Sequence, residues 1–233
     1  MLPPALLAIS HGTGSPAGQA AVASLVDAVA ARLAGVDVRL GHVDVQQPDI
    51  ASSLAALPGR GVVLVPLLLS AGYHVHVDLA EAAGGRDDVT VTPALGPDPR
   101  LAVVLADRLA ALGTDADADA AVVLAVAGSS DERANDDCRA VSALLADRIG
   151  RPVTVGFLAA AQPSLNEAVA AAAASGPVVV ATYLLAPGYF HDLAVTRSAP
   201  HPVARPLLDD APPADELVDL VVARYRAAAT SSS

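Results

Sequence analysis

An internal repeat constrains this chain more than any other feature, because one pattern of apolar runs and helical segments is written twice. Two dipeptides recur in the second half at separations of 115 and 116 residues: Gln47-Pro48 as Gln162-Pro163, and Gly72-Tyr73 as Gly188-Tyr189. A polar stretch without aromatic residues lies between the two copies, at 114–120. We therefore predict two similar domains, at 1–113 and 121–233, joined by a linker at 114–120.

Short apolar runs alternate with segments of helical periodicity in both halves. Ala5–Ile9 and Ala121–Val126 have the length and composition of buried strands, and Ser15-Pro16 is a typical helix start. Further strands are expected at 36–45, 62–67, 89–92, 152–158 and 177–184, helices at 16–33, 48–57, 98–112, 133–149 and 163–174, a helical segment after Gly72, and a frayed tail from 227. This alternation predicts an α/β fold of two similar domains, each a small parallel sheet flanked by helices. A ligand cleft is expected between them, outside the carboxyl ends of the strands.

The composition indicates a folded, acidic protein and excludes several functional classes. Hydrophobic residues make up 53% and charged residues 17% of the chain, which excludes a largely disordered protein. The net charge is −11 and all 14 basic residues are arginines, so no basic face for nucleic acid is visible. A single cysteine, Cys138, excludes an internal disulfide framework. The chain shows no signal peptide, and its longest apolar run, Val62–Leu69, is too short to span a membrane, so we expect a cytoplasmic protein.

The repeat also serves as an internal control, because it shows which polar residues occur in one copy only. Three residues at or beyond the ends of first-half strands are replaced in the second half: His11 by Gly128, Asp44 by Ala159 and His74 by Phe190. The second copy keeps the apolar pattern without them, so folding does not require them. We therefore predict a functional site in the first half.

Two imidazoles and a carboxylate are suitable ligands for Fe, Co, Ni or Zn, and a neutral histidine accepts protons near pH 7. Each residue also has a structural alternative, since a histidine after a strand often bonds a loop carbonyl and a strand-end aspartate often caps a helix. His76, two residues after His74, is a further candidate at the rim of the cleft. His42 is expected to be structural rather than catalytic, and a contribution from His191 is left open.

The glycine-rich segment at 11–15 (HGTGS) is either an anion cradle or a simple strand-to-helix turn. It matches neither a dinucleotide-binding GxGxxG motif nor a P-loop, which argues against a nucleotide-binding protein. No GxSxG motif is present, which argues against a serine hydrolase.

Three motifs together resemble the class II tetrapyrrole chelatases. They are Ser10-His11-Gly12 after the first strand, Asp44 followed by Gln47-Pro48, and the segment PLLLSAGYHVHVDL at Pro66–Leu79. Within that family the chain is most similar to the sirohydrochlorin chelatases of siroheme and cobalamin biosynthesis. The resemblance extends over both halves, and the segment Pro66–Leu79 is its most distinctive part.

This resemblance implies ATP-independent insertion of a divalent metal into a metal-free tetrapyrrole. It implies that His11 and His74 bind the metal and accept the pyrrole protons, and that Asp44 stands where family members often carry a glutamate, one methylene longer. His76 lies outside the family motif and is a further candidate ligand. The motif residues beside the two histidines are the expected tetrapyrrole contacts: Ser10, Gly12, Gly72 and Tyr73.

The resulting hypothesis is a sirohydrochlorin ferrochelatase that makes siroheme. The alternatives are a cobaltochelatase of cobalamin biosynthesis and a non-catalytic carrier of metal or tetrapyrrole. Arg133 and Arg197 are candidate partners for the carboxylates of sirohydrochlorin. No cofactor is implied beyond the divalent metal substrate, Fe²⁺ or Co²⁺. Fusion of two copies in one chain predicts a monomer.

Overall fold

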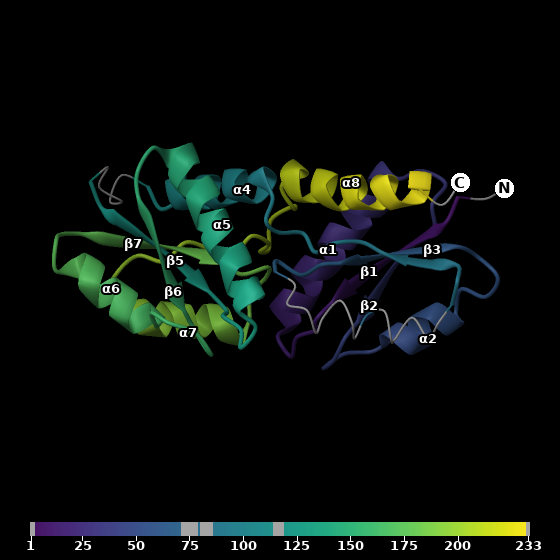
Figure 1. Cartoon of the computed structure of the whole chain (residues 1–233), viewed down its shortest axis with the longest axis horizontal. Helices are drawn as coiled ribbons and strands as arrows, with labels where there is room; N and C mark the ends of the chain where they lie inside the picture. Colours follow the sequence, from purple (N-terminus) through teal and green to yellow (C-terminus); the bar gives the residue numbers. More distant parts are fainter. Residues whose placement is uncertain (1–2, 71–78, 80–85, 114–118, 232–233) are drawn as a thin grey trace.

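The computed structural model describes residues 3–70, 79, 86–113 and 119–231. Along the chain its elements are β1 (Ala5–Ser10), α1 (Pro16–Arg32), β2 (Val38–His42), α2 (Ile50–Ala55), β3 (Val62–Pro66), β4 (Val89–Val91), α4 (Pro99–Ala110), β5 (Ala121–Val126), α5 (Glu132–Ile149), β6 (Val153–Phe157), α6 (Leu165–Ala173), β7 (Val178–Tyr183), α7 (Tyr189–Ser198) and α8 (Asp215–Ser231). They form two sheets with strand orders β2-β1-β3-β4 and β6-β5-β7, in which all neighbours are parallel. The predicted α/β fold with two parallel sheets is confirmed (Figure 1).

Local sequence signals place most of these elements. Every residue of β1 is buried, and the Ser15 hydroxyl accepts a hydrogen bond from the Gly18 backbone N–H at the start of α1, where Pro16 takes the first helical position. The helix expected after Gly72 lies outside the described residues apart from Leu79, as does most of the predicted linker.

Several predicted boundaries differ from the structure by a few residues, and three of the differences are instructive. Strand β2 ends at His42 rather than at 45, because Val45 adopts a left-handed backbone conformation with φ of 66° that an extended strand cannot accommodate. Helix α2 begins at Ile50, after the Asp49 side chain has capped it. The tail predicted to fray from 227 is helical through Ser231, because α8 packs a buried apolar face against the rest of the molecule.

Equivalent hydrogen bonds fix the correspondence between the two copies. The Asp44 N–H donates to the His11 carbonyl oxygen (3.0 Å), and the Ala159 N–H donates to the Ala127 carbonyl oxygen (2.9 Å). His11 therefore corresponds to Ala127, and the predicted counterpart Gly128 is wrong by one position. Gly128 corresponds instead to Gly12, and both have positive φ, 84° and 94°. The correspondence of Asp44 with Ala159 is confirmed.

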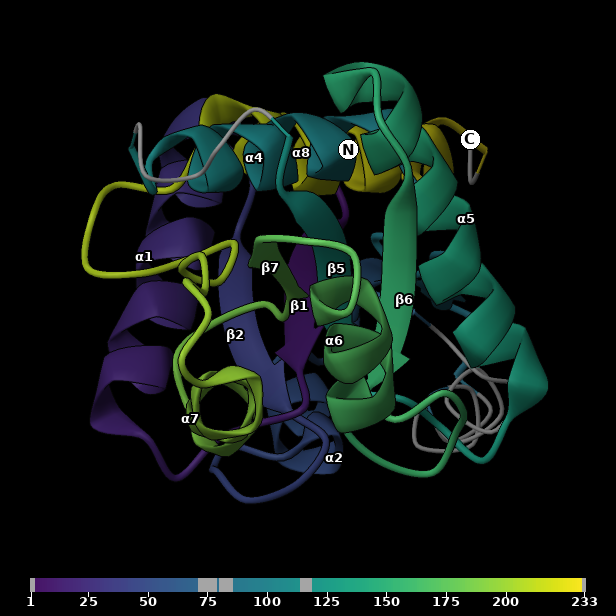
Figure 2. The same ribbon diagram turned by 90° about the vertical axis from the view of Figure 1, so that its left-hand side faces the viewer.

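The last helix of each copy packs against the sheet of the other copy. Helix α4 contacts α5 and β7 of the second half, whereas α8 contacts α1 and β3 of the first half. Figures 1 and 2 show α4 and α8 together along one side of the molecule, with α2, α6 and α7 along the opposite side. The exchange ties the two sheets into one packed body.

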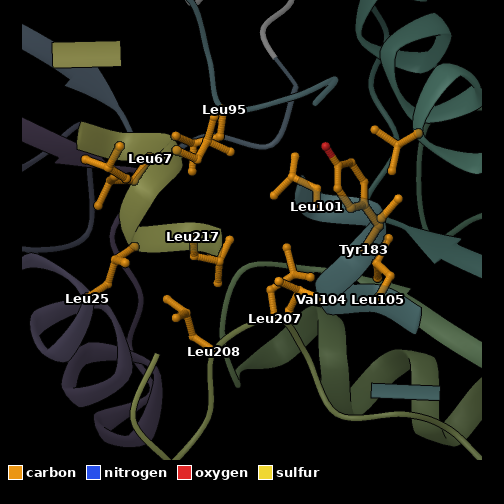
Figure 3. Close-up of a cluster of buried hydrophobic side chains, with 14 of the residues drawn as sticks. Leu25, Leu67, Leu95, Leu101, Val104, Leu105, Tyr183, Leu207, Leu208 and Leu217 are labelled. Atoms are coloured by element: carbon orange, nitrogen blue, oxygen red, sulfur yellow. The ribbon is translucent and has the colours of Figure 1, made fainter. Parts of the chain in front are cut away.

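One hydrophobic cluster contains buried residues of both sheets and of the helices α1, α4, α5 and α8. Figure 3 shows part of it, in which Leu25 and Leu67 of the first half lie with Leu207, Leu208 and Leu217 of the second. The Tyr183 hydroxyl also donates a hydrogen bond to the Leu69 carbonyl oxygen across the two halves (2.7 Å). Apolar surface shared in this way resists separation of the halves and holds any cleft between them in a fixed shape. None of the helices described is long and apolar enough to cross a membrane.

Candidate functional site

A cleft of about 440 Å³ lies at the carboxyl ends of the strands, where the sequence predicts a ligand site. Its first-half wall is Ser10, the last residue of β1, and the loop His11–Gly14 after it, with the apolar side chains of Val22 and Leu67 beside them. Its second-half wall is Ala127 and the apolar segment Leu184–Phe190, which runs from the end of β7 into the first turn of α7. The two walls differ in character, so one side offers ligating and hydrogen-bonding groups and the other an apolar surface.

His11 lies on the polar wall with an exposed side chain. Its loop is held against the loop that carries Asp44, since the Asp44 N–H bonds the His11 carbonyl and the Thr13 N–H donates to Gln46 Oε1 (2.9 Å). Gly12 makes this approach possible, because a Cβ at that position would collide with the Asp44 carbonyl oxygen. The backbone therefore fixes the place of His11 while its imidazole is left available to the cleft.

Ser10 and His42 form a buried polar pair beneath this loop. Each is only 4% exposed, and Ser10 Oγ shares a hydrogen bond of 2.8 Å with His42 Nδ1. Burial lowers the pKa of His42, so its imidazole is neutral at pH 7. Ser10 borders the cleft and His42 is not among the lining residues, which agrees with the predicted structural role of His42.

Asp44 has an exposed side chain, and its Oδ1 accepts a hydrogen bond from the Val45 N–H (2.7 Å). The alternative that Asp44 caps a helix is not what the structure shows, because Asp49 caps α2 by accepting from the Ser52 N–H (2.7 Å). The backbones of Asp44 and His11 are brought together, but the Asp44 carboxylate is not among the groups that line the cleft.

The other predicted site residues of the first half, Gly72, Tyr73, His74 and His76, lie outside the described residues. Within the described part of the chain, no group of three or more His, Cys, Asp or Glu side chains could hold a metal ion. The described portion of the candidate site therefore consists of His11, Asp44 and their supporting residues.

The second half contributes aromatic side chains that sequence reasoning missed. Tyr189 and Phe190 line the cleft and are 73% and 39% exposed, and their rings meet edge to face with centroids 5.5 Å apart. The sequence did contain a signal for them, because the repeat aligns Phe190 with His74. At that position the second copy has an apolar ring instead of a candidate ligand. An exposed aromatic pair beside a polar wall is suited to a flat, conjugated ligand.

The remaining candidates do not line this cleft. Arg197 donates a hydrogen bond to the Leu158 carbonyl oxygen (2.6 Å), and Arg133 lies in the first turn of α5. His191 is half-buried, and its Nε2 has no hydrogen-bond partner among the described residues. None of the three is among the described residues that line the cleft.

Comparison with known proteins settles the family. The CbiX family model matches the chain twice, over residues 5–112 and 121–225. The chain belongs to the CbiX family. The match confirms both the internal repeat and the family resemblance drawn from the motifs. No curated protein has a significant sequence match to the chain.

Solved structures of this family share the fold. SirB from Bacillus subtilis with Fe³⁺ is 21% identical, with a TM-score of 0.79 over 98% of this chain and 96% of SirB. SirB from Bacillus subtilis subspecies spizizenii in complex with cobalt is 19% identical, with a TM-score of 0.75 over 97% and 95% of the two chains. CbiX, the terminal enzyme for siroheme biosynthesis in denitrifying bacteria, is 20% identical, with a TM-score of 0.63 over 96% and 99%. At these identities the likeness establishes the two-sheet fold.

Proposed function

We propose that this CbiX-family protein is a sirohydrochlorin ferrochelatase, which inserts Fe²⁺ into sirohydrochlorin without ATP and releases siroheme. The observation that carries the proposal is the cleft, in which His11 of one wall faces an apolar, aromatic wall of the other half. Iron is the first choice because the family neighbours include SirB with Fe³⁺ and an enzyme of siroheme biosynthesis. Cobalt is the second candidate, since another SirB structure holds that metal.

Metal insertion requires that the metal lose water and that two pyrrole N–H groups lose protons. A neutral histidine can perform either task, by donating a lone pair to the metal or by accepting a proton. We assign these roles to His11 and His74, and, on the family motif rather than on the lining of the cleft, we assign to Asp44 the task of holding the partly desolvated cation. A site with only two or three protein ligands leaves positions open, so the metal can leave for the macrocycle.

The second-half wall would hold the macrocycle. Stacking on Tyr189 and Phe190 would orient one face of the tetrapyrrole toward His11, and the adjoining apolar residues would exclude water. The first copy of the repeat would then bind the metal, and the second copy would bind the macrocycle.

We expect Phe190→Ala and Tyr189→Ala each to raise KM for sirohydrochlorin about 10-fold, because an aromatic stacking contact is worth about 1.4 kcal/mol. Steady-state rates at varied tetrapyrrole and saturating metal measure this. Val195→Ala is the matched control, since Val195 is an exposed apolar residue of α7 that is not among the cleft-lining residues. An unchanged KM in both aromatic variants would exclude this wall as the tetrapyrrole surface.

The proposed activity is tested by anaerobic absorbance of sirohydrochlorin with catalytic amounts of protein and Fe²⁺, and separately Co²⁺, each against a blank without protein. Enzyme-dependent change over many turnovers identifies a chelatase, and the ratio of the two rates ranks the metals. Stoichiometric binding without acceleration for either metal would identify a carrier instead.

A further inference from the structure

The buried pair Ser10–His42 joins the ends of two neighbouring strands. Ser10 is the last residue of β1 and His42 the last residue of β2, and the two are direct partners in the register of the sheet. Their side chains share the 2.8 Å hydrogen bond described above, and both are almost fully buried. A buried polar pair is costly unless each group is satisfied, so its presence at these buried strand ends calls for a reason.

The second copy shows that the fold does not need this pair. The equivalent register partners are Val126, the last residue of β5, and Phe157, the last residue of β6. Their exposures are 0% and 1%, so the same strand ends are closed there by an apolar contact. One backbone hydrogen bond beyond the strand ends is kept in both copies, from Asp44 to His11 and from Ala159 to Ala127.

The polar pair and the candidate ligands occur together and are lost together. His11 directly follows Ser10, and Asp44 lies two residues after His42. In the second copy the same two positions are Ala127 and Ala159, which cannot ligate a metal. A hydrogen bond is directional and constrains both distance and angle, whereas an apolar contact has no directional preference. Such a bond is therefore suited to fixing two ligand-bearing strand ends relative to each other.

We propose that the Ser10–His42 hydrogen bond is a positioning clasp that sets the separation of His11 and Asp44 for a divalent cation. The inference rests on the proposed function in taking these two residues as metal ligands. In this proposal His42 is a positioning residue. It acts through its hydrogen bond to Ser10, which precedes His11, and through its place at the end of β2, two residues before Asp44.

The test replaces the clasp with the pair that the second copy uses. In Ser10→Val/His42→Phe, we expect Kd for Co²⁺, titrated by its visible absorption, and KM for the metal to rise at least 10-fold. The KM for sirohydrochlorin does not enter the test, because Ser10 itself lines the cleft. Ser10→Ala removes only the hydroxyl and guards against misfolding of the double variant, whereas Ser10→Thr keeps a hydroxyl and should retain tight metal binding.

A stability-matched variant separates positioning from general loosening. Val29→Ala shortens a buried side chain of α1 and should lower the melting temperature without changing Kd for Co²⁺. Wild-type Kd and metal KM in both clasp variants would overturn the proposal, as would an equal loss of affinity in Val29→Ala or the absence of saturable Co²⁺ binding in the wild type. The Co²⁺ titration needs no tetrapyrrole, so it decides the clasp even if the wild-type protein fails to metallate sirohydrochlorin.

Discussion

His11→Ala is expected to slow sirohydrochlorin metallation at least 100-fold while leaving the melting temperature within about 2 °C of the wild-type value. The loss in rate follows from removing a group that serves as metal ligand and proton acceptor, since a positioned general base alone contributes about 10²- to 10⁴-fold. The fold should be unaffected because the imidazole is exposed and the backbone bond from Asp44 does not involve it. The second copy already carries alanine there, with the same backbone hydrogen bond at Ala127.

Initial rates under anaerobic conditions and thermal unfolding measure the two effects. His201→Ala is the control, since His201 lies in the loop after α7 and is not among the cleft-lining residues. It should retain the wild-type rate. We expect His74→Ala to resemble His11→Ala, on the strength of the family motif. Near-normal rates in both variants would reject the assignment of these histidines.

Gly12→Ala is expected to destabilise the protein by about 3 kcal/mol and to abolish metallation. Two effects combine at this position. Its φ of 94° lies in the region that side chains rarely adopt, and a Cβ would collide with the Asp44 carbonyl oxygen. Relief of that collision must push the His11 loop away from the Asp44 loop, so both candidate ligands move. Denaturant unfolding and initial rates measure the outcome.

Substitutions at two other glycines distinguish the effect of the positive φ from the effect of the collision. Gly35 also has positive φ, 83°, but a Cβ there meets nothing within 4 Å, so Gly35→Ala should cost only about 1 kcal/mol and keep the rate. Gly128 has the same collision in the second copy, with the Ala159 carbonyl oxygen. Gly128→Ala should therefore lose similar stability with a smaller loss of metal affinity than Gly12→Ala. Equal stability for Gly12→Ala and Gly35→Ala would show that the two loops are not in tight contact.

Much of this architecture could be predicted from the sequence because the responsible signals are local. A continuous apolar run such as Ala121–Val126 specifies a buried strand, and Ser15 followed by Pro16 specifies a helix start. The repeat then doubles each signal, and it pointed to His11 and Asp44 through their absence from the second copy. The counterpart of His11 was placed one residue too far, because the 116-residue separation of the two Gly-Tyr pairs already aligns Gly12 with Gly128; the hydrogen bonds give the same alignment.

Sequence alone thus determined the two α/β copies, the family and the strand-end position of the candidate ligands, since each depends on short-range periodicity or on a contiguous motif. Tertiary structure alone decided that α4 and α8 exchange sheets, because an apolar helix face does not specify which of two similar sheets it covers. It also decided that Ser10 bonds His42, 32 residues away, and that Tyr189 and Phe190 face the loop of His11. These are contacts between distant segments, and they exist only once the packed core has fixed where each strand ends.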